Sequence, residues 1–88
     1  MYAVIVDVSI SDVEQSQREL REQVVPRVSK APGFVSGVWM EQGEGKGHSV
    51  MVFENEDAAH EVAQHVRSTA PSAVSIDQVS VHEVVAHA

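Results

Sequence analysis

The sequence predicts an α+β fold of the ferredoxin-like type, with the element order βαββαβ. Three observations predict it: four runs rich in β-branched residues, two amphipathic segments between them, and a glycine-rich turn that joins the middle runs. Such a chain forms an antiparallel four-stranded sheet with two helices on one face. The 88 residues are enough for one domain, residues 1–88.

The first run, Tyr2–Ile10, is expected to be a central strand. Its first half is apolar on both faces, and its second half alternates Val8 and Ile10 with Asp7 and Ser9. A segment that is apolar on both faces is typical of a strand that is covered on both sides.

The segment Ser11–Lys30 is expected to be the first helix. Ser11 and Glu14 have the spacing of a capping box, and valine and leucine then recur at helical intervals. Pro26 should bend or end the last turn, because proline lacks a backbone donor and crowds the carbonyl one turn earlier. Pro32 and Gly33 stop the helix.

The second predicted strand, Phe34–Gln42, holds Phe34 and Trp39. The two aromatic residues are five positions apart, so a regular strand would place them on opposite faces. We therefore expect one of them under the helices and the other toward a partner sheet.

The rest of the chain predicts a hairpin, a strand, a helix and a strand. Gly43–Gly47 is interpreted as a hairpin and not as a phosphate-binding loop, because strands flank it and Gly47 follows Lys46. Asn55 is a good N-cap for the second helix. The remaining expected elements are a strand at 48–55, the helix at 55–68 and a last strand at 74–88 with a frayed end.

The composition excludes several classes of partner. A formal net charge of −7 argues against nucleic acid and against anionic membrane surfaces, which both attract Lys and Arg. The chain has no cysteine, so it holds no disulfide and no thiolate metal site. The apolar N-terminus lacks a basic region and carries Asp7, so it reads as a strand and not as a signal peptide. We expect a cytoplasmic protein.

The sheet face without helices is expected to mediate self-association. If odd positions of the last strand point outward, Val79 and Val81 lie on this face. A domain of this size buries only about 60–65% of its unfolded surface, so covering an apolar sheet face by a second copy adds needed burial.

The passage "VVPRVSKAPGFVSGVW", Val24–Trp39, resembles the end of the first helix and the second strand of the dimeric α/β-barrel superfamily. The similarity is to its antibiotic-biosynthesis-monooxygenase-like branch, and it covers essentially the whole chain in element order. The resemblance implies a homodimer whose sheets pack face to face, with a cleft between sheet and helices in each subunit.

The same resemblance implies a range of activities. Members include cofactor-independent monooxygenases of polycyclic phenols, haem-degrading enzymes, lyases, isomerases and proteins without a known reaction. The haem-degrading members use a first-strand Asn, a Trp and a second-helix His. Here Asp7 stands in the first strand, Trp39 lies in the second strand and His60 and His65 lack a ligand motif. We therefore expect no cofactor and no metal.

Asp7 and His65 are the candidate catalytic residues. A carboxylate buried in an apolar run would have a raised pKa and act as acid or base, while the alternative is a structural Asp that pairs with a polar group. His65 falls beside the apolar stripe of its helix and is either a general base in the cleft or a boundary residue paired with Glu61.

Trp39 and Phe34 are the candidate substrate-binding residues. An indole can stack on a planar ligand in a cleft, or it can anchor a core or a dimer interface. Which face each residue takes decides between these interpretations.

Two functional hypotheses follow. In the first, the protein is a cofactor-independent monooxygenase-like enzyme that acts on an aromatic small molecule, with Asp7 or His65 as proton acceptor and Trp39 as stacking wall. In the second, it is a non-catalytic small-molecule-binding module of the same fold. The sequence holds no complete catalytic set, so both hypotheses stay open.

Overall fold

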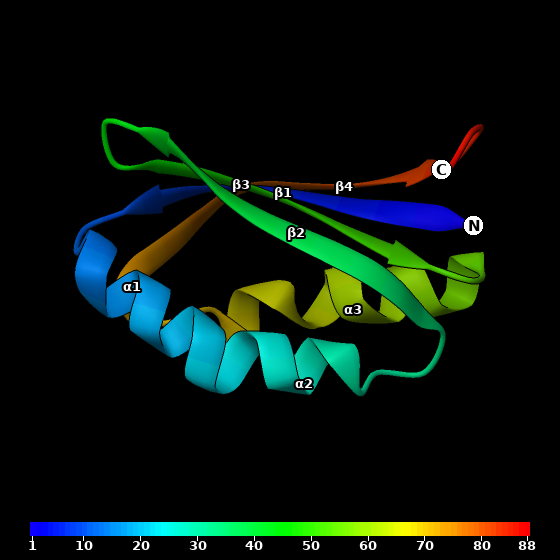
Figure 1. Cartoon of the computed structure of the whole chain (residues 1–88), viewed down its shortest axis with the longest axis horizontal. Coiled ribbons are helices and arrows are strands. Elements are labelled where there is room, and N and C mark those ends of the chain that lie inside the picture. The colour runs from blue at the N-terminus through cyan, green and yellow to red at the C-terminus, as the bar shows by residue number, and fades with distance from the viewer.

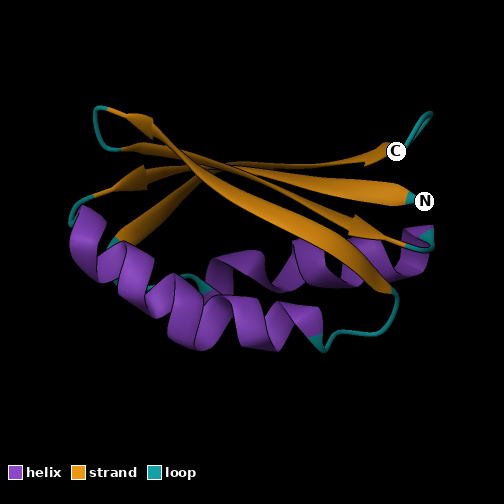
Figure 2. Cartoon of the chain, in the orientation of Figure 1, coloured by secondary structure: helices purple, strands orange, loops and turns teal.

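The computed structural model describes all 88 residues and has a four-stranded antiparallel sheet in the order β2-β3-β1-β4. All helices lie on one face of the sheet and leave the other face open (Figures 1 and 2). The predicted ferredoxin-like βαββαβ fold is therefore confirmed. The elements are β1 (Tyr2–Ile10), α1 (Val13–Glu19), η1 (Leu20–Val24), α2 (Val25–Ser29), β2 (Phe34–Gly43), β3 (Lys46–Phe53), α3 (Glu56–Thr69) and β4 (Val74–Glu83).

The segments α1, η1 and α2 follow one another without a break and form one continuous helix, whose middle part is a π-helix. The Val25 N–H donates to the carbonyl oxygen of Leu20, five residues back. Pro26 follows directly, and its missing donor and bulky ring are accommodated by this wider turn. The helix therefore does not end at the proline, and it continues to Ser29.

The helix begins one residue later than the predicted capping box. Asp12 is the N-cap, and its side chain accepts a 3.0 Å hydrogen bond from the Gln15 N–H. Ser11 is not available as a cap, because its hydroxyl donates to the carbonyl of Ala73 at 3.2 Å. At α3 the predicted cap is confirmed, since the Asn55 side chain accepts from the Ala58 N–H.

β1 lies between β3 and β4 and sets the two faces of the sheet. Its even-numbered residues pack toward the helices, and Val4 and Val6 are buried there. On β4, Val81 pairs with Val4 and Val79 pairs with Val6, so both valines face the helices. The expectation that Val79 and Val81 lie on the open face is wrong, because this register carries them to the side of their β1 partners.

The hydrophobic core lies at one end of the layer between sheet and helices. Val4, Phe53 and Ala59 are fully buried, and Met51 is nearly so. Only 11 of the 88 residues are buried in the single chain, so much of the apolar interior is accessible. The hairpin predicted at Gly43–Gly47 is confirmed, and its turn holds three residues with positive φ, Gly43, Glu44 and Gly45.

Candidate functional site

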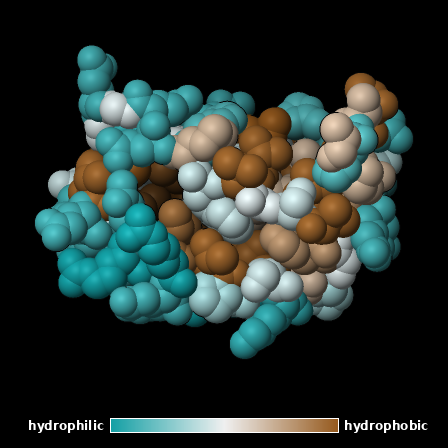
Figure 3. All heavy atoms as spheres, in the orientation of Figure 1, coloured by the Kyte–Doolittle hydropathy of each residue, from teal (hydrophilic) through white to brown (hydrophobic).

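A cavity of about 570 Å³ opens between the sheet and the helices, beside the core. Of its 29 lining residues, 17 are hydrophobic, so its interior suits an apolar ligand. Figure 3 shows a brown recess between hydrophilic atoms, at the end of the molecule where α1 begins. The floor is formed by the ends of β1 and β3 away from the core, and the roof by the first helix and α3.

Small side chains explain why this end stays hollow. The helical residues that face the sheet here are Leu20, Val24, Val28, Val62 and Val66, and all are only half-buried. Across from them, Gly47 contributes no side chain to the floor, and the Val8 and Ile10 side chains lie over it. At the other end, Phe53 and Val4 fill the same layer. The layer is thus packed at one end and open at the other.

Trp39 forms a wall of the cavity. It lies on β2 opposite Ser49 of β3, and its six-membered ring lies over Gly37. A Cβ at Gly37 would sit 2.6 Å from Trp39 Cη2 and 2.8 Å from Cζ3, closer than side-chain carbons approach. Gly37 therefore makes room for the indole.

Phe34 lies on the same sheet face as Trp39, and the expectation of opposite faces is wrong. The register of β2 against β3 shifts between Phe34 and Ser36, and this bulge reverses the alternation once. Phe34 packs edge-on against Phe53, with ring centroids 5.8 Å apart. Trp39 lines the cavity, whereas Phe34 is absent from its lining and belongs to the packing around the core.

His65 lies at the mouth of the cavity on α3. Its side chain is 62% exposed, and Nε2 lies 3.3 Å from Glu61 Oε1, one helical turn earlier. The imidazole thus borders the cavity and keeps contact with solvent. His60 makes the equivalent contact with Glu56 at 3.6 Å and does not line this cavity.

Asp7 lies on the open face of the sheet, so the structure does not bring it together with His65. On β1 it alternates with Val6 and Val8, which face the helices. Its carboxylate contacts His48 of β3 at 2.5 Å, and its side chain is 41% exposed. Of the two interpretations of Asp7, the structure agrees with the one in which it pairs with a polar group.

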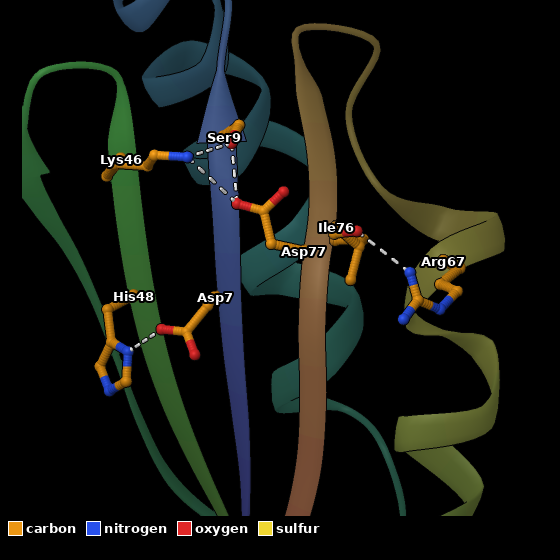
Figure 4. A network of polar contacts seen from close by, with 7 residues as sticks. All are labelled: Asp7, Ser9, Lys46, His48, Arg67, Ile76 and Asp77. Carbon is orange, nitrogen blue, oxygen red and sulfur yellow. Dashed lines mark hydrogen bonds and ion pairs between the residues drawn. The ribbon is translucent and has the colours of Figure 1, made fainter.

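Asp7 and His48 belong to a polar end of the open face (Figure 4). Beside them, the Ser9 hydroxyl donates to Asp77 at 2.7 Å, and Lys46 Nζ donates to Ser9 Oγ at 2.8 Å. Lys46 also lies 3.6 Å from Asp77. The sequence did not predict the contact between Asp7 and His48, because the two residues are 41 positions apart and only the register of β1 on β3 joins them.

Glu19 ties the first helix to the loop before β4, next to the cavity. Gln15 Nε2 donates to Glu19 Oε1 at 2.7 Å, and the backbone N–H and hydroxyl of Ser72 both donate to the same carboxylate at 3.2 Å. The hydrogen bond from Gln15, with a smaller part from Ser72, holds the pKa of Glu19 below its ordinary value of 4.5. The ionised carboxylate of Glu19 is therefore the form that accepts these hydrogen bonds from Gln15 and Ser72.

Tyr2, the only tyrosine, is unsuited to act as a base. The negative charges of Glu56 and Glu83 beside it raise the pKa of its phenol above the ordinary value of 10.0. The phenol is therefore neutral at physiological pH.

No group of three or more His, Asp or Glu side chains is arranged to hold a metal ion. None of the helices has the length and apolar character needed to cross a membrane.

Two solved structures are similar to this chain over nearly its whole length. One is a dimeric ferredoxin-like protein from an uncultured marine organism, with 11% identity and a TM-score of 0.58, covering 99% of this chain and 97% of that chain. The other is the heme degrader MhuD from Mycobacterium tuberculosis with two hemes bound in its active site, with 20% identity and a TM-score of 0.54, covering 97% of this chain and 98% of that chain.

These similarities establish the fold. Both agree with the ferredoxin-like fold that the sequence predicted. No protein-family model matches the sequence, and no curated protein matches it either. Identities of 11% and 20% carry no activity from these proteins to this chain.

Proposed function

We propose that this protein is a homodimer that binds a flat, apolar small molecule in the cavity between sheet and helices. The observation that carries the proposal is the cavity of about 570 Å³, mostly apolar in lining and walled by the indole of Trp39. Ligand sites have volumes of about 300–1,000 Å³ and combine an apolar lining with few polar groups. An aromatic ring stacked on Trp39 is a ligand of this kind.

The open face of the sheet supports the dimer. Val38 and Met40 on β2 are 55% and 45% exposed, and Ile5 and Val50 lie beside them on the same face. A core as small as that of the single chain gains stability when a second sheet covers these side chains. One of the two similar structures is described as dimeric, which also favours self-association.

The binding proposal is tested by filling the cavity. Val24 lines it from the roof, and Val24→Phe adds a ring to the space that a ligand would take. We expect the affinity for 2-naphthol, a flat aromatic probe, to fall at least about tenfold, because ligand and side chain compete for one volume. Val85→Phe is the matched control, since Val85 is 93% exposed. Equal affinity of both variants would contradict the proposal.

A second candidate function is cofactor-independent oxygenation, and the position of His65 at the cavity favours it. In this reaction the imidazole takes a proton from an activated CH₂ group or phenol of the substrate. The resulting carbanion bonds to molecular oxygen and forms a peroxide, which loses water and leaves a ketone or quinone. The substrate supplies the electrons, so one substrate and one oxygen molecule give one oxidised product and one water.

The oxygenase proposal is tested with anthrone, a tricyclic ketone with an acidic CH₂ group, by measuring oxygen uptake. We expect His65→Ala to lower turnover about a hundredfold, because a positioned base typically contributes that much. His60→Ala is the matched control, since His60 makes the same contact with a glutamate but lies away from the cavity. Asp7→Asn should also leave turnover unchanged, because Asp7 faces the other side of the sheet. Equal rates in wild type and His65→Ala would overturn this assignment.

Haem binding is tested separately, because the similar structure of the heme degrader contains bound heme. If His65 ligated haem iron, added haemin would show a shifted Soret band, and His65→Ala would abolish that shift. We expect the protein to bind 2-naphthol. With haemin, we expect no change of the Soret band that depends on His65.

A further inference from the structure

The lining of the cavity holds two polar side chains that are more than nine-tenths buried. They are Ser16 on α1, which is 6% exposed, and Ser49 on β3, which is 7% exposed. Ser49 lies on the floor between Val6 of β1 and Trp39 of β2, and Ser16 belongs to the helical roof. The two layers thus each contribute one buried hydroxyl to the same cavity.

Neither hydroxyl has a hydrogen-bond partner within the chain. Other serines show the contrast: the hydroxyls of Ser11 and Ser29 donate to backbone carbonyls. No side-chain oxygen that is fully shut off from solvent lacks a partner, so the Ser16 and Ser49 oxygens both touch open space. Since both residues line the cavity, that open space is the cavity itself.

The charged residues of the lining lie elsewhere. Arg21, Arg27, Glu41, Glu61 and His65 are all exposed, so ionic groups gather at the mouth and the interior is neutral. Because the Ser16 and Ser49 hydroxyls face the cavity and have no partner in the chain, only water can satisfy them when no ligand is bound, and a ligand hydroxyl or carbonyl can take the place of that water. A serine hydroxyl both donates and accepts, so a ligand hydroxyl or carbonyl satisfies it.

We infer that Ser49, with Ser16 across the cavity, selects neutral aromatic ligands that carry a hydroxyl or carbonyl group at their buried end. This inference rests on the proposed ligand-binding function and adds the chemical class of the ligand. A ring that stacks on Trp39 has its substituents in the ring plane, and the adjacent strand position is occupied by Ser49. Trp39 therefore determines the plane of the bound ring, and Ser49 determines which way the polar substituent of the ligand points.

The experiment compares two probes of equal ring size, 2-naphthol and naphthalene, by equilibrium dialysis with the full chain. We expect wild type to bind 2-naphthol about three- to tenfold more tightly than naphthalene, the worth of one hydrogen bond. Ser49→Ala should remove most of this preference and leave the affinity for naphthalene unchanged. Ser16→Ala tests the roof hydroxyl separately. Ser36→Ala is the matched control, because Ser36 lies on the open face opposite Val52.

The outcomes separate this inference from the proposed function. If wild type binds both probes equally and Ser49→Ala changes nothing, selection by the serines is overturned while the binding proposal stands. If wild type binds neither probe, the binding proposal fails and this inference fails with it. Loss of the 2-naphthol preference in Ser49→Ala but not in Ser36→Ala supports the inference. Thermal unfolding of each variant verifies that both serine variants are folded.

Discussion

The two faces of the sheet differ in what covers them and in how polar groups are distributed over them. On the helical face, apolar side chains surround the buried hydroxyls of Ser49 and Ser16, and ions stay at the cavity mouth. On the open face, the charged side chains of Asp7, Lys46 and Asp77 lie on the strands at one end, and Val50 and Val52 of β3 lie toward the other end. One strand, β1, contributes to both faces by simple alternation.

This difference teaches how to interpret a carboxylate in an apolar strand. The apolar neighbours of Asp7 in sequence are Val6 and Val8, and they lie on the other face of the sheet. The neighbours of Asp7 in space are His48 and Gln78, which are polar. An apolar run therefore does not by itself indicate a buried acid or base.

The largest expected effect concerns the open face. In Val38→Asp, each subunit of the proposed dimer brings an unpaired carboxylate into the apolar part of this face. We expect the dissociation constant to rise at least about a hundredfold, because burying an unpaired charge costs several kcal/mol. Sedimentation velocity measures it. Val85→Asp adds the same charge at an exposed site outside the sheet, and dimers that persist equally in both variants would refute the open face as the interface.

The residue beside Val38 tests the helical face. In Gly37→Ala, the new Cβ would lie 2.6 Å from Trp39 Cη2, so the indole must move. We expect the free energy of unfolding in urea to fall by about 1–3 kcal/mol, the usual cost of overpacking, and the emission of the single tryptophan to shift. Ser36→Ala on the open face should show neither change. A Gly37→Ala variant as stable as wild type would mean that the indole does not need the space above Gly37.

The smallest expected effect concerns the contact between Glu19 of the first helix and Ser72 in the loop before β4. Because the pKa of Glu19 is lowered on folding, its contribution to stability is fully present above its ordinary pKa of 4.5 and is lost as pH falls through the lowered value. The difference in Tm between wild type and Glu19→Gln should thus be constant near neutral pH and shrink below about pH 4.5. Glu14→Gln removes one charge from the same helix without this contact and is the control. A Tm difference that does not change with pH would disprove the role of the carboxylate.

Element order, helix positions and the hairpin could be predicted from the sequence, because they depend on local periodicity and on turn residues. The sequence could not predict on which face of the sheet Phe34, Val79 and Val81 lie. One extra residue in a strand, or a different strand register, moves a side chain to the opposite face. The Asp7–His48 contact and the cavity depend on strand pairing and on the distance between helix and sheet, which no local pattern encodes. Trp39 could be predicted as a candidate, but its exposure to the cavity required the structure.

The cavity also determines how this fold responds to hydrostatic pressure. Pressure unfolds proteins by eliminating dry internal voids, whereas this cavity of about 570 Å³ opens to solvent at its mouth. Water can enter it in the folded state, so its volume adds little to the volume change of unfolding. A molecule seated beside Trp39 therefore replaces water in this cavity instead of filling a void.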